Sequence, residues 1–117
     1  MKKILILEDD LQRVKLFSEN FMNAELIFTQ IPAEAIHHLK IEEFDYLFLD
    51  HDLGGKVYAP SDENSGYEVA RWLEEHPDRQ PKHIILHSLN PAGVTRMQQA
   101  LPEAKVVPFV WTKVIQF

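Results

Sequence analysis

Phe48-Leu49-Asp50-His51-Asp52-Leu53-Gly54-Gly55 is the stretch of this sequence that decides its fold. An apolar run from Tyr46 to Leu49 ends abruptly in an acid, an imidazole, an acid and then two glycines. A short apolar run of this kind is typical of a strand buried in a sheet. We therefore expect a strand that carries chemically active groups at its carboxyl end.

Two other apolar runs end in the same manner. The chain opens with Ile4-Leu5-Ile6-Leu7-Glu8-Asp9-Asp10, and later contains Ile84-Ile85-Leu86-His87-Ser88-Leu89-Asn90-Pro91. Ligands bind at the carboxyl edge of the strands in open α/β sheets. Three strands that deliver oxygen and imidazole groups at this edge predict a single site there.

The elements expected from the pattern alternate between strand and helix. The strands are Lys3–Leu7, Leu26–Thr29, Phe44–Asp50, His83–His87 and Val106–Val110. The helices are Leu11–Phe21, with Asp10 as its candidate cap, Pro32–Leu39, Ser65–Glu75, which opens with the capping-box pattern Ser65-Gly66-Tyr67-Glu68, and the helix that ends at Leu101, with Asn90 as its N-cap before Pro91. This alternation predicts one α/β domain over residues 1–117, with a parallel sheet covered on both faces. We choose the three-layer flavodoxin-like order 2-1-3-4-5, which places strands 1 and 3 side by side.

The bulk composition fits one domain and excludes several kinds of site. The chain has 117 residues, 45% of them hydrophobic, which is enough for a core without cross-links. The absence of cysteine excludes disulfides and thiolate metal sites. A net charge of −6 argues against binding along an extended nucleic-acid backbone. No signal peptide or membrane-length apolar run is visible, so we expect a cytoplasmic protein without membrane contact.

The acids at the ends of strands 1 and 3 are candidate metal ligands. In the chosen topology Glu8 and Asp9 lie next to Asp50, and Asp52 is near. Carboxylates a few ångströms apart repel each other, and a divalent cation relieves this repulsion. Oxygen ligands suit Mg²⁺ or Mn²⁺, so we expect one of these ions at Glu8, Asp9 and Asp50. The alternative is that these acids only cap helices and form turns.

Two histidines and one acid at the strand ends are candidates for proton transfer. If the third strand stays extended, Asp50 and Asp52 point to one face of the sheet and His51 to the other. Asp52, His51 and His87 are then the candidate general acids and bases. The alternative is that both histidines are buried for structural reasons.

The segment after the fourth strand is a candidate phosphate site. Ser88 has a hydroxyl that can donate to a phosphoryl oxygen, and Asn90 and Gly93 lie at a predicted helix start, where N–H groups favour an anion. The alternative for Ser88 is a turn or helix cap. A nucleophilic Ser-His-Asp triad is disfavoured because the sequence has no Gly-x-Ser-x-Gly pattern.

On these residues the chain resembles the receiver domain of two-component response regulators over almost its whole length. Glu8 and Asp9 are similar to the acidic pair after strand 1, Asp50 to the phospho-accepting aspartate, and Ser88 to the hydroxyl residue after strand 4. The resemblance implies that the acids hold Mg²⁺, that a histidine kinase phosphorylates Asp50, and that Ser88 contacts the phosphoryl group.

The chain departs from the receiver pattern in three ways. Val107 stands where a receiver has a lysine before a proline at the end of strand 5. Only Trp111 to Phe117 follow the fifth strand, so we expect the fifth helix to be missing or vestigial. The loop from Gly54 to Ser65 is longer than in a typical receiver.

These departures resemble a narrower group, the cyclic-phosphate-processing receiver-like domains. The shared segments are Leu49-Asp50-His51-Asp52-Leu53-Gly54, Ser65-Gly66-Tyr67-Glu68-Val69 with Trp72-Leu73, and His87-Ser88-Leu89-Asn90-Pro91-Ala92-Gly93 with Arg96-Met97. The resemblance implies that the ligand is a phosphorylated small molecule or an RNA end bearing a cyclic phosphate.

Three hypotheses about function remain open at this point. The first is a metal-dependent protein that binds cyclic phosphates of nucleotides or RNA, or hydrolyses them as a phosphoesterase. The second is a signalling receiver that is phosphorylated on Asp50 and docks a partner. The third is an interaction module that neither binds metal nor accepts phosphate, which the intact acids at two strand ends disfavour.

Overall fold

The five strands pair in the order β2-β1-β3-β4-β5, and every pair is parallel. Their bounds are β1 (Lys3–Leu7), β2 (Glu25–Thr29), β3 (Tyr46–Leu49), β4 (His83–Leu86) and β5 (Lys105–Val106). The coordinates are a computed structural model, which describes residues 1–53, 60–62 and 64–117. The flavodoxin-like order expected from the sequence is confirmed. Most of the loop expected from Gly54 to Ser65 lies outside the described residues.

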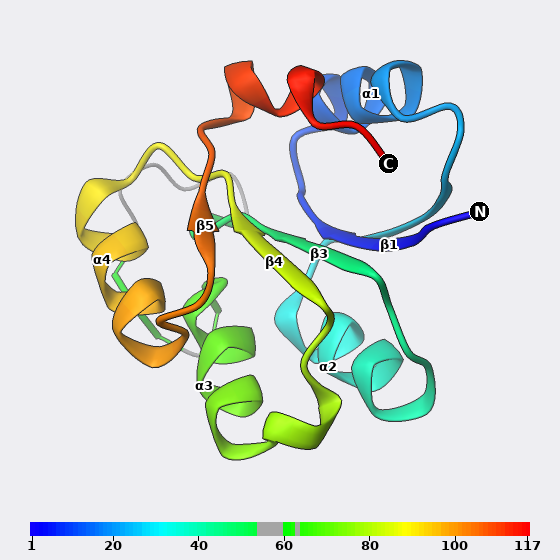
Figure 1. Cartoon of the computed structure of the whole chain (residues 1–117). Coiled ribbons are helices and arrows are strands. Elements are labelled where there is room, and N and C mark those ends of the chain that lie inside the picture. The colour runs from blue at the N-terminus through cyan, green and yellow to red at the C-terminus, as the bar shows by residue number, and fades with distance from the viewer. Residues whose placement is uncertain (54–59, 63) are drawn as a thin grey trace.

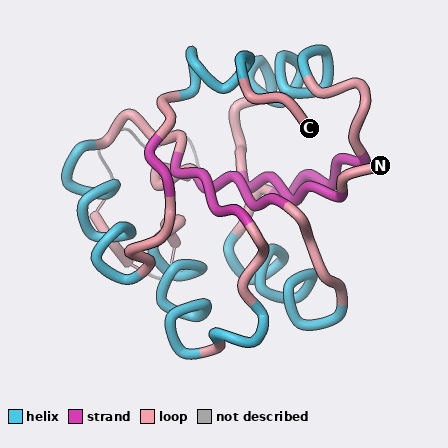
Figure 2. Tube along the Cα trace, in the orientation of Figure 1, coloured by secondary structure: helices cyan, strands magenta, loops and turns pink. Residues whose placement is uncertain are grey.

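Helices cover both faces of this sheet and make the fold three layers thick (Figure 1). Their bounds are α1 (Leu11–Asn20), α2 (Pro32–Ile41), α3 (Tyr67–Glu75) and α4 (Pro91–Ala100), with the short 3₁₀-helices η1 (Pro77–Arg79) and η2 (Phe109–Val114). Helix α1 and η2 lie on one face, and α2, α3 and α4 lie on the other. Figure 2 shows the strands as a single layer between these two groups of helices.

Two helices begin with the side-chain caps that the sequence predicts. Asp10 precedes α1, and its Oδ1 accepts hydrogen bonds from the backbone N–H groups of Gln12 at 2.9 Å and Arg13 at 3.3 Å. Asn90 precedes α4, and its Oδ1 accepts from Gly93 N–H at 3.0 Å. These bonds satisfy N–H groups that have no partner within the helix, and they fix where each helix starts.

The start of α3 differs from the predicted capping box. The helix begins at Tyr67, and Gly66 before it already has helical backbone angles. The Oγ atom of Ser65 accepts from Tyr67 N–H at 3.3 Å, whereas the N–H of Ser65 donates to the carbonyl of Asp62. Because that N–H is already used, Glu68 has no donor to cap, and the reciprocal bond of a capping box does not form.

Alternate residues of the central strands enter two different apolar clusters. Odd-numbered residues of β1 and β3, such as Leu5 and Leu49, pack under α2, α3 and α4. Even-numbered residues, such as Ile6 and Phe48, pack against Phe17 of α1. Side chains alternate between the two faces of the sheet along each strand. The same alternation determines on which face the residue just after the strand lies.

The chain after β4 differs from the sequence prediction. We expected a strand over Val106–Val110, but β5 has two residues and the chain then forms η2. The N–H groups of Val107 and Phe109 still donate to the carbonyls of Leu86 and His87, at 3.0 Å and 3.2 Å, but the chain enters η2 at Phe109 and the regular pairing stops. In the described part of the chain no α-helix follows β5, as expected. Within that same part, none of the helices is both long and apolar enough to cross a membrane.

Candidate functional site

Three side chains form a row at the carboxyl ends of the central strands. Leu7, Leu49 and Leu86 are register partners across β1, β3 and β4. The residues that follow them are Glu8, Asp50 and His87, all buried. One candidate ligand atom from each lies within 4.8 Å of the others. The strand ends therefore meet as the topology predicts, and we call Glu8, Asp50 and His87 the strand-end row.

Glu8 and His87 are joined inside this row. His87 Nε2 lies 3.0 Å from Glu8 Oε1, and both side chains are fully buried. Burial lowers the pKa of His87, and the hydrogen bond to Glu8 opposes this shift only in part. The imidazole is therefore neutral at pH 7, and its Nε2–H donates because a carboxylate can only accept. The sequence marked both residues as candidates but did not predict that they pair.

The Glu8 carboxyl stays ionised despite its burial. Burial acts to raise its pKa, but the hydrogen bond from His87, the N–H of Asp10 at 3.1 Å and the charge of Arg13 outweigh it, and the pKa is lowered. The row therefore holds a fixed negative charge next to the third strand.

The negative charge of Glu8 also affects the pKa of Asp50. Burial, reinforced by the negative charge of Glu8, raises the pKa of Asp50 to about 8. One of its oxygens accepts the N–H of His51 at 2.9 Å. A carboxyl with this pKa is mostly protonated at pH 7, and a cation placed against it would release the proton.

Arg13 provides a positive charge that the sequence analysis missed. Its Nη1 atom lies 3.6 Å from Glu8 Oε1 and 3.9 Å from Asp50 Oδ2. The guanidinium lies over the ring of Phe109, 4.9 Å from the ring centre. Because Asp10 caps α1, Arg13 falls in the first turn of that helix, directly above the strand ends. The predicted cap could have suggested this position.

Val107 has no part in this charge cluster. It is half-buried and packs with Phe109 against the apolar cluster under α1. Among the described residues, the cation that reaches Asp50 is Arg13 of α1, whereas the receiver resemblance implies a lysine at the end of strand 5.

The donor atoms of the row fit a divalent cation. The carboxylates of Glu8 and Asp50 converge beside the imidazole of His87, and ions with oxygen ligands at about 2.0–2.6 Å need carboxylate oxygens at this spacing. Mg²⁺ commonly uses one or two carboxylates and completes its shell with water and phosphate oxygens. Asp9, which we also predicted as a ligand, is half-buried and is not a member of the described group, so its role stays a prediction.

A second polar cluster lies on the opposite face of β3. His51 Nδ1 lies 2.9 Å from Asp52 Oδ1, and His51 Nε2 lies 2.8 Å from Ser61 Oγ. Asn90 Nδ2 donates to Asp52 Oδ1 at 2.9 Å. The alternation of the strand predicted that His51 points away from Asp50, and it does. Ser61 was not recognised in the sequence.

Asp52 does not share a face with Asp50, contrary to expectation. The prediction assumed that the third strand stays extended to Asp52. β3 ends at Leu49, and the chain then turns, so Asp52 lies beside His51. The site residues expected to act together are therefore divided between two clusters.

The predicted phosphate-binding residues are partly engaged within the fold. Ser88 Oγ accepts from Asn90 N–H at 3.1 Å, which leaves the serine O–H able to donate elsewhere. Gly93 N–H already donates to Asn90 Oδ1. A Cβ atom at Gly93 would lie 2.3 Å from Cγ of His51, so this glycine allows the backbone of α4 to touch the imidazole. Phosphate binding by these residues stays a prediction.

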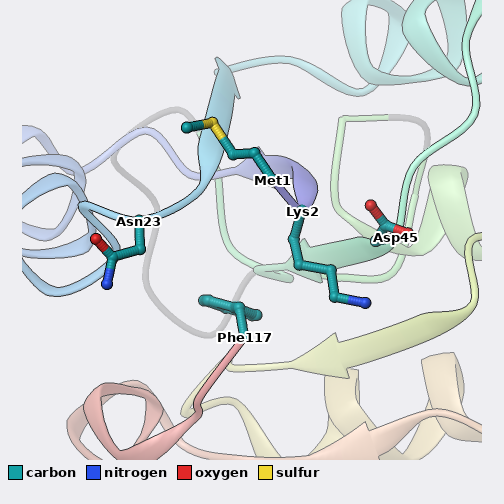
Figure 3. Close-up of a pocket in the computed structure, with 5 residues that line it drawn as sticks. All are labelled: Met1, Lys2, Asn23, Asp45 and Phe117. Atoms are coloured by element: carbon teal, nitrogen blue, oxygen red, sulfur yellow. The ribbon is translucent and has the colours of Figure 1, made fainter.

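Two pockets differ in their relation to these clusters. One, of about 660 Å³, lies over the second cluster and is lined by Pro60, Ser61, Asn90, Pro91, Ala92, Gly93 and Arg96. The other, of about 370 Å³, is lined by Met1, Lys2, Asn23, Asp45 and Phe117 (Figure 3). The smaller pocket, shown in Figure 3, lies at the amino ends of the strands, and its Asp45 side chain accepts a hydrogen bond from the backbone N–H of Lys3 at 2.9 Å. It contains none of the candidate site residues.

Solved structures share this fold. The phosphorylated cyanobacterial phytochrome response regulator RcpA aligns with a TM-score of 0.73 and 19% identity, over 91% of this chain and 79% of that one. The Mn²⁺-bound form of response regulator Rcp1 gives 0.71 and 19%, over 92% and 81%. The receiver domain of a histidine kinase from Syntrophus aciditrophicus gives 0.75 and 19%, over 97% and 83%. These likenesses establish the receiver fold.

Sequence comparison places the chain more narrowly. No curated protein matches it. The model of one family, the cyclic-phosphate processing receiver domain, matches residues 4–103 and so includes both clusters of polar residues. The chain belongs to the family of cyclic-phosphate processing receiver domains.

Proposed function

We propose that this domain binds Mg²⁺ or Mn²⁺ at Glu8 and Asp50, with Asp9 as a further ligand, and acts on cyclic phosphates of nucleotides or RNA ends. The observation that carries the proposal is the buried strand-end row, in which two carboxylates face each other with Arg13 beside them. Buried acids that repel each other favour a cation, and an arginine beside them favours a phosphate.

Each residue of the row has a separate task in this proposal. The cation, held by the two carboxylates, would polarise a phosphoryl oxygen and lower the pKa of a bound water. Arg13 donates N–H groups to a second phosphoryl oxygen, and Ser88 donates its hydroxyl to a third. His87 keeps the Glu8 carboxylate oriented through its Nε2–H.

The histidines and Asp52 keep the proton-transfer roles that the sequence suggests. His87 keeps its role as a candidate general acid or base at the row through its contact with Glu8. His51 and Asp52 lie in the other cluster and would act on a ligand that reaches the pocket over α4.

The comparisons support this proposal in two ways. The matching family carries cyclic-phosphate processing in its name. One structural neighbour, Rcp1, was solved with Mn²⁺ bound. The cytoplasmic location expected from the sequence stays a prediction.

Two parallel incubations with Mg²⁺ or Mn²⁺ test the proposal. The first contains 2′,3′-cyclic nucleotides and an RNA that ends in a cyclic phosphate. We expect hydrolysis of the cyclic phosphate, lost in Asp50→Asn and retained in Asp78→Asn, a control at an exposed aspartate of η1. Hydrolysis that is unchanged in Asp50→Asn would refute the role of the row.

The alternative, a signalling receiver, is tested by the second incubation, which contains acetyl phosphate. Asp50 and Ser88 occupy the strand ends that phosphorylation requires, and a histidine kinase would then be the partner. A mass gain of one phosphoryl group on Asp50, with the first incubation silent, would select this alternative. Two observations disfavour it: Asp50 is only 5% exposed, and Val107 replaces the lysine. If neither hydrolysis nor phosphorylation is observed, the third hypothesis, an interaction module, is favoured.

A further inference from the structure

The second polar cluster contains Ser61, a residue to which the proposed function gives no role, bonded to His51 and Asp52. Ser61 Oγ, the imidazole of His51 and the carboxylate of Asp52 form a chain of hydrogen bonds, 2.8 Å and 2.9 Å long. The imidazole between them is fully buried. A hydroxyl, a base and a carboxylate that orients the base, in this order and within this reach, are the components of an activated serine.

The direction of each hydrogen bond follows from Asn90. Its Oδ1 accepts from Gly93 N–H at 3.0 Å, which fixes Nδ2 as the donor to Asp52. Asn90 Nδ2 also lies 3.3 Å from His51 Nδ1, but the shorter contact of Nδ1, 2.9 Å, is to Asp52. The Asp52 carboxylate can only accept, so His51 Nδ1 must carry a hydrogen to bond to it, and Asn90 Nδ2 then donates to Asp52. In a neutral imidazole this leaves Nε2 as an acceptor. Ser61 therefore donates its O–H to Nε2, which is the arrangement that a general base needs.

The imidazole is held rigidly in this orientation. On one side the backbone of Gly93 lies so close that a Cβ there would be 2.3 Å from His51 Cγ. The backbone of His51 is also held, because Gly66 N–H donates to its carbonyl at 2.9 Å. A base whose ring is fixed by packing on α4 and by hydrogen bonds is preorganised for proton transfer.

The hydroxyl of Ser61 lies beside a pocket that carries a positive charge. Ser61 lines the pocket of about 660 Å³ together with Arg96 of α4. Among the described residues that line it, Arg96 is the one with a charged side chain. The ligand that matches such a pocket carries an anionic group next to an electrophilic centre, and a phosphate ester has both.

We propose that Ser61 is a nucleophile for anionic phosphate esters, with His51 as its general base and Asp52 as the residue that orients His51. The Ser61 Oγ–P bond forms as the ester P–O bond breaks. The serine proton moves to His51 Nε2 and then to the departing oxygen. Water hydrolyses the phosphoserine ester in a second step, and His51 again removes the proton. The absence of a Gly-x-Ser-x-Gly motif disfavoured such a triad in the sequence, but the geometry does not require that motif.

This inference stands or falls separately from the strand-end row, because Ser61, His51 and Asp52 lie outside that row and no cation takes part. A fluorophosphonate probe tests it in the presence of EDTA. Attack by Ser61 releases fluoride, and the proton moves to His51. We expect one adduct per chain, mapped to Ser61 by peptide mass spectrometry, and no adduct in Ser61→Ala. Ser18→Ala, a control at an exposed serine of α1, should label as the wild type does.

The variant Asp52→Asn tests whether Ser61 reacts because His51 activates its hydroxyl or only because of where Ser61 lies. Asparagine can donate to His51 Nδ1, which would place the imidazole hydrogen on Nε2, facing Ser61. We expect the labelling rate to fall at least tenfold, with circular dichroism unchanged. Asp78→Asn, at an exposed aspartate of η1, should label at the wild-type rate, and labelling in EDTA shows that the reaction needs no cation at the strand-end row.

The anion preference of the pocket is tested with inorganic phosphate. Phosphate at millimolar concentration should slow labelling of the wild type, and Arg96→Gln should remove this protection. Absence of labelling, labelling that persists in Ser61→Ala, or an unchanged rate in Asp52→Asn would overturn the nucleophile. Labelling that phosphate does not slow would overturn the assignment of phosphate esters.

Discussion

Replacing Asp50 by asparagine should stabilise the domain at neutral pH when no divalent cation is present. Burial and the charge of Glu8 raise the pKa of Asp50 to about 8 from an ordinary 3.8. Folding at pH 7 therefore forces this carboxyl to take up a proton that it does not hold in the unfolded chain. Asparagine is already neutral, and its oxygen can still accept the N–H that His51 donates.

The size of the effect follows from the two pKa values. Because the folded pKa is raised, the stability that Asp50 allows is complete below pH 3.8 and is lost as the pH rises toward 8. At about 1.4 kcal/mol per pKa unit, the loss between the ordinary pKa and pH 7 is about 4 kcal/mol. Asp50→Asn should recover most of this free energy.

Urea unfolding at pH 4, 5.5 and 7 measures this difference in the presence of EDTA. The free energy of unfolding of Asp50→Asn should exceed that of the wild type at pH 7, and the two should converge toward pH 4. Asp78→Asn is the matched control at an exposed position and should change little at any pH.

A saturating divalent cation should stabilise the wild type alone, by about 2.7 kcal/mol at a concentration of 100 Kd. The difference in the free energy of unfolding between Asp50→Asn and the wild type should then become smaller. An Asp50→Asn variant that is less stable than the wild type at pH 7 without cations would refute the reasoning. It would mean that Arg13 already neutralises the ionised carboxylate.

Three further predictions follow from the same contacts. Cation binding should release a proton from Asp50, so the Kd for Mn²⁺ should rise about tenfold per pH unit below the pKa of about 8, and calorimetry in buffers of different ionisation enthalpy checks this. Gly93→Ala should destabilise the fold by about 1–3 kcal/mol in urea, because its Cβ would overlap the ring of His51, whereas Ala92→Gly should change it by less. Asp10→Ala should cost about 1 kcal/mol through loss of the α1 cap, and an unchanged midpoint would show that the cap contributes nothing.

The sequence predicted the sheet well because its signals are local and repeated. Short, continuous apolar runs that alternate with amphipathic helices leave few parallel topologies. The prediction was wrong at β5, where the N–H of Phe109 bonds to the carbonyl of His87 as the chain enters η2, and at Ser65, whose N–H bonds to Asp62 rather than to Glu68. Both errors concern which hydrogen-bond partner a backbone group finds, and the side-chain pattern does not encode that choice.

The candidate site was predicted in part. Register and alternation together place Glu8, Asp50 and His87 in one row, and the sequence contained both signals. Arg13 and Ser61 were missed for different reasons. Arg13 reaches the row from the first turn of a helix, and Ser61 reaches His51 from ten residues along the chain. Contacts of this kind depend on how loops and helices pack, which the spacing of residues in the sequence does not reveal.

Titration with Mn²⁺, followed by electron paramagnetic resonance, tests the central claim about the strand-end row most directly. The free ion has a strong signal that decreases on binding, so the measurement needs neither a substrate nor a partner. We predict one bound Mn²⁺ per chain at pH 8, lost in Asp50→Asn and in Glu8→Gln, and retained in Asp78→Asn. A signal that stays that of free Mn²⁺ with the wild type would contradict the claim and leave Arg13 as the cation of the row.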